Sequence, residues 1–522
     1  MKTINRKFSV LVGLLVLLAT LLVACGDNTA TPVPATTTAA ATTASATTVA
    51  ATTASATTAA ATTAAATTTV TTASATTAAA TGVGVTVDVD GTKVTIKPGG
   101  GQKFEPKSEV TVTIWSSQVK GNGERLATIM KDFEAANPKI KVKIDTRNDT
   151  FTYNDILKAL TQSATAGGMP NIATGYENWV PAFVDAKLAL GLNKFISGQY
   201  GLSQKDLEDY RPNMLARGIF PQYNNETYTW LFSNSGPVMY YNQDLFTQYG
   251  LKTPDENYTW DQFVSDSKTV TEKSGGKAVG YVFPTKSVSE LIAMPIYARG
   301  GQIYDYQNGK FLFDQKPALD QLNMLYDGVK AGYFATADPG VAFDNQIRFE
   351  QQKSLFYIAS TSSRSFLADD ISKGNNSAKP FNWSATVPPH AAGVKPVTTL
   401  YGGAILGFKG KSDDEDLATW EVMKFMGSAG FQAKWASASG YVPATKSTVD
   451  DPTYKTFLAA APQNKIPLVV YDYASAAEPK LGQWQQVRDL VDSNVDALFQ
   501  GKGTPADTVK AINDQANATL KK

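Results

Sequence analysis

Residues 29 to about 82 are almost entirely alanine and threonine, and a segment of this composition cannot build a core. Bulky apolar side chains are nearly absent, so nothing offsets the entropy that the chain would lose on ordering. Alanine favours a helix but threonine does not, which argues against a rigid rod. We expect a flexible tether with an r.m.s. reach of ~40 Å for ~54 residues, and its threonines are candidates for O-glycosylation.

An export signal precedes this tether. Lys2, Arg6 and Lys7 make a positive start, and an apolar run follows over residues 8–24. The run approaches the length of a membrane-spanning helix, but its ending Leu-Val-Ala before Cys25 resembles the bacterial lipobox, in which the cysteine thiol is acylated. We therefore expect a signal peptide over 1–24, lipidation of Cys25, and a protein anchored outside the cytoplasmic membrane, on the outer face of the bacterial cell membrane.

Charge and rare residues narrow the possible functions. The chain has 48 Lys+Arg and 47 Asp+Glu, one cysteine and one histidine, His390. Near-zero net charge argues against a nucleic-acid partner, and a single cysteine rules out a disulfide within the chain and a zinc site built from several Cys and His ligands. We expect no cofactor and no bound metal. The histidine follows two prolines, and we expect it at the surface.

Residues 83–98 have the pattern of a β-hairpin. Valines alternate with polar residues on both sides of Asp90-Gly91, a strong signal for a tight turn between two strands. An isolated two-stranded hairpin is marginally stable, so residues 83–108 form either a hairpin docked on the main body or a partly ordered spacer. No function is assigned to them.

From about residue 109 onward the pattern is that of an α/β protein. Residues 110–115 alternate like a strand, Leu126, Ile129, Met130 and Phe133 recur at helical spacing, and a second strand follows at 140–144. A strand, a helix and a strand in this order predict a parallel pair with a crossover helix.

Several motifs in this body resemble those of extracellular solute-binding proteins (family 1) of carbohydrate-type ABC importers. Residues 237–246, PVMYYNQDLF, are similar to the family's "YYNKDLF", and YTWDQF at 258–263 and SGYVPATK at 439–446 follow in the family's order. The resemblance implies a two-lobed periplasmic-binding-protein-like α/β fold (type II), with the ligand cleft between the lobes and a hinge of two or three crossing segments. The implied lobes are 109–233 with 403–450 and 237–400 with 451–522, and the implied crossings lie near 231–237 and 401–403.

Within that family the chain is most similar to the glycerol-3-phosphate-binding branch. The segments that carry this likeness are FSNSGPV at 232–238, YGGA at 401–404 and LGQWQQVR at 481–488. Three positions depart from the branch: Ser116 replaces a histidine, Arg364 a glycine and Trp484 a methionine. An added cation and an added ring at such positions can change the ligand.

Carrying the family's contacts over by position implies a set of ligand-facing residues. They are Trp115, Tyr153, Glu177, Ser235, Ser362, Ser363, Gly402, Tyr441 and Arg488. Their chemistry suits a polyol phosphate, since an arginine fork binds phosphate bidentately and a carboxylate such as Glu177 accepts from adjacent hydroxyls.

Each of these residues has a structural alternative. Arg488 lies off its helix's apolar stripe and could be solvated. Tyr153, Tyr441 and Trp115, like Trp179, could pack in the core. The serines could cap a helix that starts near Arg364. Glu177 follows the expected end of a strand, where open α/β sheets bind ligands, and its alternative is a solvated charge.

The function that these observations favour is a non-enzymatic, monomeric binding lipoprotein. It would capture a small polyol phosphate or sugar, with glycerol 3-phosphate or a glycerophosphodiester favoured, and deliver it to a membrane permease driven by an ATPase. The alternatives are a binding protein for a neutral oligosaccharide and a surface-anchored carbohydrate-active hydrolase, whose carboxylate pair the acidic residues do not exclude. A purely structural adhesin would explain the tether but not the cleft motifs.

Overall fold

The computed structural model describes residues 82–521 apart from 119–120, 149 and 378. The expected export signal, the lipidation site at Cys25 and the Ala/Thr tether lie outside these residues. Among the helices that are described, none is both long and apolar enough to cross a membrane.

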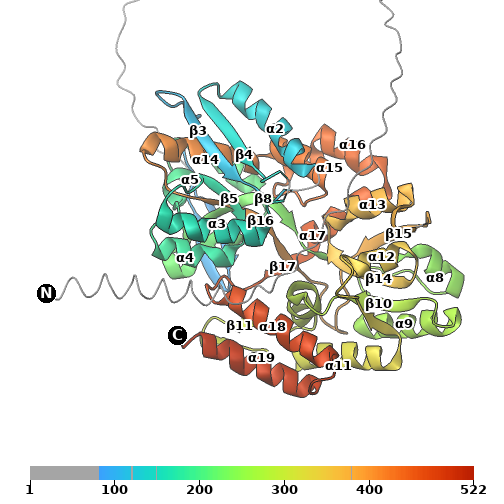
Figure 1. The fold of residues 1–522 in the computed structure, drawn as a ribbon. Coiled ribbons are helices and arrows are strands. Elements are labelled where there is room, and N and C mark those ends of the chain that lie inside the picture. Colours follow the sequence, from blue (N-terminus) through green and yellow to red (C-terminus); the bar gives the residue numbers. More distant parts are fainter. Residues whose placement is uncertain (1–81, 119–120, 149, 378, 522) are drawn as a thin grey trace, which may run out of the picture. The chain divides into compact units, whose positions relative to one another are not determined.

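The first of two large sheets contains the predicted parallel pair. Its strand order is β17-β16-β5-β3-β4, and β8 also pairs with β16 (Figure 1). β3 pairs in parallel with β4 and β5, which confirms the prediction from the strand–helix–strand pattern. The strands are β3 (Val110–Trp115), β4 (Ile140–Asp145), β5 (Ile172–Gly175), β8 (Thr229–Ser235), β16 (Thr398–Gly407) and β17 (Ala474–Ala477).

Helices that pack with this sheet bury the predicted apolar faces. The crossover helix α2 (Asn122–Ala136) buries Leu126, Ile129, Met130 and Phe133, as its spacing predicted. The others in this part of the chain are α3 (Tyr153–Ala166), α4 (Val180–Asp185), α5 (Asn193–Ile196), α6 (Gln204–Asp209), α7 (Pro212–Arg217), α14 (Asp413–Gly427) and α15 (Ala429–Ser439).

The second large sheet has the order β13-β10-β14-β9-β15. Its strands are β9 (Pro237–Asn242), β10 (Val279–Phe283), β13 (Phe334–Thr336), β14 (Ser354–Ser360) and β15 (Trp383–Thr386). Its helices are α8 (Gln243–Tyr249), α9 (Trp260–Ser274), α10 (Met294–Ala298), α11 (Lys316–Ala331), α12 (Asp344–Glu350), α13 (Ser363–Lys373), α18 (Trp484–Phe499) and α19 (Pro505–Thr519). The last two lie side by side (Figure 1) and their apolar faces join the core of this second lobe.

The chain crosses between the two sheets at Gly236. β8 ends at Ser235 in the first sheet and β9 starts at Pro237 in the second. A Cβ atom on Gly236 would lie 2.3 Å from the Thr399 carbonyl oxygen, so only glycine fits this close approach. The chain is back in the first sheet by Thr398, where β16 begins, so residues 401–403 lie inside this strand. Helices α16 (Pro452–Ala460) and α17 (Ile466–Tyr473) then lead to β17, after which the chain enters α18.

The N-terminal hairpin is docked on the first lobe. β1 (Val85–Val89) and β2 (Thr92–Ile96) pair in antiparallel fashion around Asp90 and Gly91, both with positive φ. Val87, Val89, Val94 and Ile96 belong to the same apolar cluster as the helices of this lobe, and β1 packs against α7.

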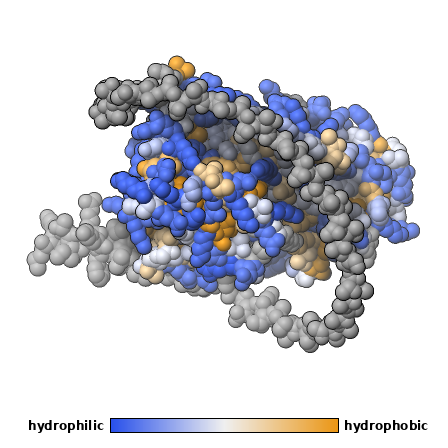
Figure 2. All heavy atoms as spheres, turned by 90° about the horizontal axis from the view of Figure 1, so that it is seen from above, coloured by the Kyte–Doolittle hydropathy of each residue, from blue (hydrophilic) through white to orange (hydrophobic). Residues whose placement is uncertain are grey.

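Most buried side chains of the described residues are apolar. The face drawn in Figure 2 is mostly hydrophilic, with apolar residues in small groups between polar ones. The expectation that His390 lies at the surface is wrong, because its exposed fraction is 6%. The backbone of this residue bonds with Tyr258 and Trp260 at the start of α9, which draws the loop and its imidazole inward.

Candidate functional site

A cavity of about 170 Å³ lies where segments of both lobes meet. It is lined by the loop that follows β5, the end of α7, the turn Ser289–Ala293, the first half of β16, the end of β17 with the segment after it, and the start of α18. The lining residues are Tyr176, Glu177, Asn178, Arg217, Ser289, Glu290, Leu400, Tyr401, Ala477, Glu478, Pro479, Lys480, Trp484 and Arg488. Six of these side chains carry charge, three carboxylates and three cations.

Arg488 lines this cavity from the first turn and a half of α18. Its Nη1 forms an ion pair with Glu478 and donates to the Ser289 Oγ at 3.1 Å. Glu478 also accepts from Ser289 Oγ at 2.5 Å and from Trp484 Nε1 at 2.6 Å. Burial alone would raise the pKa of Glu478, but Arg488 and these two donors outweigh it and the pKa lies below its usual range. The carboxylate therefore stays charged and fixes the orientation of the guanidinium.

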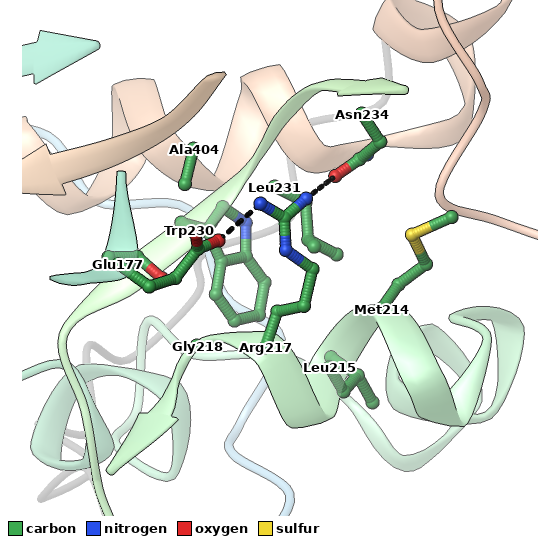
Figure 3. A pocket seen from close by; sticks show the side chains of 10 residues that line it. Glu177, Met214, Leu215, Arg217, Gly218, Trp230, Leu231, Asn234 and Ala404 are labelled. Carbon is green, nitrogen blue, oxygen red and sulfur yellow. Dashed lines mark hydrogen bonds and ion pairs between the residues drawn. The ribbon is translucent and has the colours of Figure 1, made fainter. Parts of the chain in front are cut away.

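Arg217 forms a second ion pair inside the wall. Its guanidinium, 6% exposed, lies 2.5 Å from the Glu177 carboxylate, and it also donates to the Asn234 Oδ1 at 3.2 Å (Figure 3). The carbonyl oxygens of Tyr401 and Gly402 complete its acceptors at 3.4 and 3.3 Å. The space around this side chain measures about 10 Å³, close to the minimum for one water. The buried Arg217 side chain thus links the loop after β5 to β8 and β16 through its ion pair and hydrogen bonds.

Lys480 is the third cation of the cavity wall. Its Nζ donates to the carbonyl oxygens of Ala216 at 3.1 Å and Ile219 at 2.8 Å, and lies 3.5 Å from the Asp90 carboxylate. Burial lowers the pKa of this ammonium group, and the neighbouring Asp90 counteracts the effect.

The remaining carboxylate, Glu290, is held by hydroxyl groups. It accepts from the Tyr401 hydroxyl at 2.7 Å and from Ser287 Oγ at 2.6 Å. The Tyr401 hydroxyl also bonds with Ser360, whose Oγ lies 2.9 Å from Ser235 Oγ. A chain of hydroxyl groups therefore leads from the cavity into the sheet of each lobe.

Of the nine residues expected to face a ligand, Glu177 and Arg488 line the cavity. The other seven surround it or lie in the packed lobes. Ser235 and Ser362 belong to the hydroxyl chain through Ser360, Ser363 receives a bond from the Tyr357 hydroxyl at 3.5 Å, and the Gly402 carbonyl holds Arg217.

The aromatic members of the expected set pack on other rings. Tyr153 stacks on Tyr176 with ring centroids 4.6 Å apart, and Tyr441 stacks on Trp435. Burial raises the pKa of Tyr153 far above its usual range, so its hydroxyl is neutral and can donate. Trp115 and Trp179 belong to an apolar cluster of the first lobe. The sequence alone did not decide whether these two tryptophans pack in the core or contact a ligand.

Ser362 lies at the N-terminal cap position of α13, as expected, but its side chain does not form a capping hydrogen bond. α13 begins at Ser363, with Ser362 at the cap position, but no side-chain hydrogen bond caps its first turn. The Ser362 hydroxyl instead meets Ser360 Oγ at 2.8 Å.

Sequence reasoning missed most polar residues of this wall, among them Arg217, Glu290, Tyr401, Glu478 and Lys480. Tyr401 is the first residue of the YGGA motif, and Glu478 and Lys480 shortly precede LGQWQQVR, so a place in or near a matched motif was the available signal. Arg217 and Glu290 carried none, because only folding brings their helical turns to the cavity.

Comparisons with known proteins agree with this architecture. A family model described as bacterial extracellular solute-binding protein matches residues 128–465. The sn-glycerol-3-phosphate-binding periplasmic protein UgpB of Escherichia coli (strain K12) is 22% identical over 434 residues, which cover 79% of this chain and 93% of that protein.

Solved structures share the fold at low sequence identity. UgpB from Mycobacterium tuberculosis in complex with glycerophosphocholine has a TM-score of 0.66 at 17% identity, covering 79% of this chain and 99% of that one. The cyclic α-maltosyl-1,6-maltose binding protein from Arthrobacter globiformis has a TM-score of 0.64 at 18% identity, covering 79% and 100%. The fold is therefore the two-lobed type II arrangement of periplasmic binding proteins that the motifs implied.

Proposed function

Because the chain belongs to the bacterial extracellular solute-binding proteins, we propose that it captures a small glycerophosphodiester of low net charge for an ABC importer. Members of this family bind solutes for transport and do not act on them chemically. Both glycerophosphate and sugar ligands occur among the proteins it resembles, so the ligand has to be argued from the cavity itself.

The observation that carries the proposal is the charge balance of the cavity wall. Three carboxylates face three cations, and Arg217 and Arg488 are already paired with Glu177 and Glu478. A dianion such as glycerol 3-phosphate would enter a wall with no net positive charge to compensate it. A phosphodiester has one negative charge, and with a cationic head group its net charge is zero.

Each end of such a ligand has a matching group. The Arg488 guanidinium contacts Ser289 and Glu478 through Nη1. An arginine fork carries five N–H donors, which leaves donors for a phosphate oxygen. Glu290 is held by neutral hydroxyl groups, and the Tyr401 ring stands beside it. A carboxylate next to an aromatic ring suits a quaternary ammonium group.

Transport follows from hinge closure. The two lobes meet at the cavity, and a ligand that contacts both would shift the population toward the closed form. We propose that the closed form, as a monomer, docks on a membrane permease driven by an ATPase. The lipobox at Cys25 supports anchoring by lipid to the outer face of the cell membrane, with the Ala/Thr segment as tether.

A neutral oligosaccharide is the second candidate. Paired charges offer hydrogen bonds to hydroxyl groups without attracting an ion, and Tyr176, Tyr401 and Trp484 supply rings in the same wall. This candidate keeps the transport role and changes only the ligand.

Isothermal titration calorimetry with glycerophosphocholine, glycerol 3-phosphate and maltose separates these possibilities. We expect glycerophosphocholine to bind most tightly, and Arg488→Gln to weaken both phosphate ligands by about 10- to 100-fold, the worth of a hydrogen bond to a charged group. Binding of maltose alone would overturn the phosphodiester and support the sugar. Turnover of any of the three would overturn the binding-protein role and favour the hydrolase.

Glu478→Gln provides the matched test of the charge argument. It removes the carboxylate that occupies Arg488, so we expect glycerol 3-phosphate to bind several-fold more tightly than to the unaltered protein. Glu105→Gln makes the same charge change at an exposed pair with Lys139 and serves as control. Equal effects of the two substitutions would contradict the role of charge balance.

A further inference from the structure

The hairpin β1–β2 lies outside the residues that the family model matches, 128–465. It is nevertheless firmly held on the first lobe. Two of its valines, Val87 and Val89, are 1% exposed, and the Gln204 side chain accepts from the backbone N–H of Gly84 at 2.9 Å. An accessory piece that is docked in this way has a fixed position relative to α7.

The tip of this hairpin contacts a residue of the cavity wall, Lys480, although Asp90 does not itself line the cavity. Asp90, the turn residue, lies 3.5 Å from the Nζ of Lys480, and the side chain of Lys480 is 8% exposed. The same ammonium group donates to the carbonyl oxygens of Ala216 and Ile219, at the end of α7 and just beyond it. Lys480 is thus held by contacts with the hairpin tip and with the end of α7, and it lines the cavity.

The segment that carries Lys480 is also the connection between lobes. It follows β17 of the first sheet and leads into α18 of the second lobe. Gln222 Nε2 donates to the Lys480 carbonyl oxygen at 3.0 Å from the first lobe, and the Tyr297 hydroxyl donates to the Ala477 carbonyl oxygen at 2.9 Å from the second. The charge of Lys480 therefore lies in a segment that contacts both lobes.

We propose that Asp90 is a positioning residue of the ligand site, which holds Lys480 in the cavity wall and limits the attraction of the cavity for anions. With Asp90 counted, four carboxylates stand against three cations around the cavity. The hairpin thereby makes the site select against a dianion in favour of a ligand of low net charge. This selectivity rests on the proposed function, whereas the hold of Asp90 on Lys480 does not.

Removing the Asp90 charge has two consequences. The groups that face Lys480 are Asp90 from the hairpin, Glu177 from the loop after β5 and Arg217 from α7. Without Asp90 the buried ammonium loses its nearest anion, so its pKa falls further. A phosphate group that enters the cavity then meets less repulsion and can itself pair with Lys480.

Asp90→Asn makes this change with little disturbance of the turn. Asp90 has a φ of 52° and is followed by Gly91 at 86°, and Asn-Gly is a preferred pair for such a turn. Asp88→Asn is the matched control, because Asp88 lies in the same hairpin, carries the same charge and pairs with Lys93 at an exposed site.

Two measurements on the full folded protein test the proposal. The pH midpoint of the Lys480 side-chain signal, followed by NMR of protein with ¹³C-labelled lysine and assigned with Lys480→Gln, reports its ionisation without any ligand. Calorimetric titration with glycerol 3-phosphate reports the selectivity, and Lys480→Gln combined with Asp90→Asn tests whether the effect passes through Lys480.

We expect Asp90→Asn to lower the Lys480 midpoint and to tighten glycerol 3-phosphate binding by about threefold or more, with Asp88→Asn changing neither. In the Lys480→Gln background, most of the gain should disappear. An unchanged midpoint in Asp90→Asn, or an equal effect of Asp88→Asn, would overturn the proposal. If the unaltered protein binds none of the phosphate ligands, the proposed ligand fails, and the midpoint alone still decides whether Asp90 holds Lys480.

Discussion

Glu177→Gln removes the carboxylate that faces the buried guanidinium of Arg217. The pair lies at 2.5 Å, and the exposed fractions of the two side chains are 14% and 6%. Glutamine keeps the shape and one acceptor oxygen but leaves a cation in the wall without its counter-ion. The substitution therefore tests an electrostatic contribution separately from packing.

The expected loss of stability follows from this geometry. Removing one partner of a buried ion pair destabilises a protein by about 3–5 kcal/mol. Arg217 keeps the Asn234 side chain and two carbonyl oxygens as acceptors, so we expect the lower end, about 3 kcal/mol. At ~2.1 cal/mol/K of unfolding entropy per residue over roughly 440 described residues, this lowers Tm by about 3 °C.

Differential scanning calorimetry of the ligand-free protein at pH 7 measures this shift. The double variant Glu177→Gln with Arg217→Met should recover most of the loss, because an apolar side chain needs no counter-ion. Glu105→Gln, which breaks an exposed pair with Lys139, should leave Tm nearly unchanged, because solvent screens such a pair. An unchanged Tm for Glu177→Gln, or a double variant less stable than the single one, would show that the ion pair of Glu177 with Arg217 does not stabilise the protein.

Two further substitutions test the surroundings of the cavity. Gly402 has a φ of 106°, and a Cβ there would lie 2.4 Å from the Ser233 carbonyl oxygen. Gly402→Ala should therefore lower the free energy of unfolding, measured with urea, by about 1–3 kcal/mol. A urea midpoint equal to that of the unaltered protein would contradict this strain. Burial raises the pKa of Asp492 to about 6, with Asp489 adding to the effect. The native state then binds this proton more tightly than the unfolded chain, so the contribution of Asp492 to stability falls as pH rises from about 4 to about 6. Asp492→Asn should stabilise the protein by up to about 2 kcal/mol at pH 7 and have little effect at pH 4, and an equal gain at both pH values would argue against titration as the cause.

The type of fold was readable because its signals are local. Alternation over residues 110–115, the apolar face of α2 and the Asp90-Gly91 turn each need only neighbouring residues, and each appears in the structure as expected. The motifs around Tyr240 and Tyr441 added the two-lobed arrangement, because they come from strands and turns that the whole family shares.

The chemistry of the site was only partly readable because it is built from distant residues. Arg488 was found through its motif, but its pairing with Glu478 and the contact with Ser289, 199 positions earlier, arise only on folding. Arg217 sits in a short helix among apolar residues, where a buried arginine has no periodic signature. His390 was misplaced for the same reason, since its burial depends on a contact with the start of α9 and not on its own two prolines.

A crystal structure of the protein grown with glycerophosphocholine would show whether the cavity is the ligand site. We expect the ligand in the cavity between the lobes, its phosphate hydrogen-bonded to Arg488 and its ammonium group beside Glu290 and Tyr401. A ligand bound elsewhere on the protein would contradict the assignment of the cavity. A ligand in the cavity whose phosphate does not contact Arg488 would contradict the role of this arginine in binding.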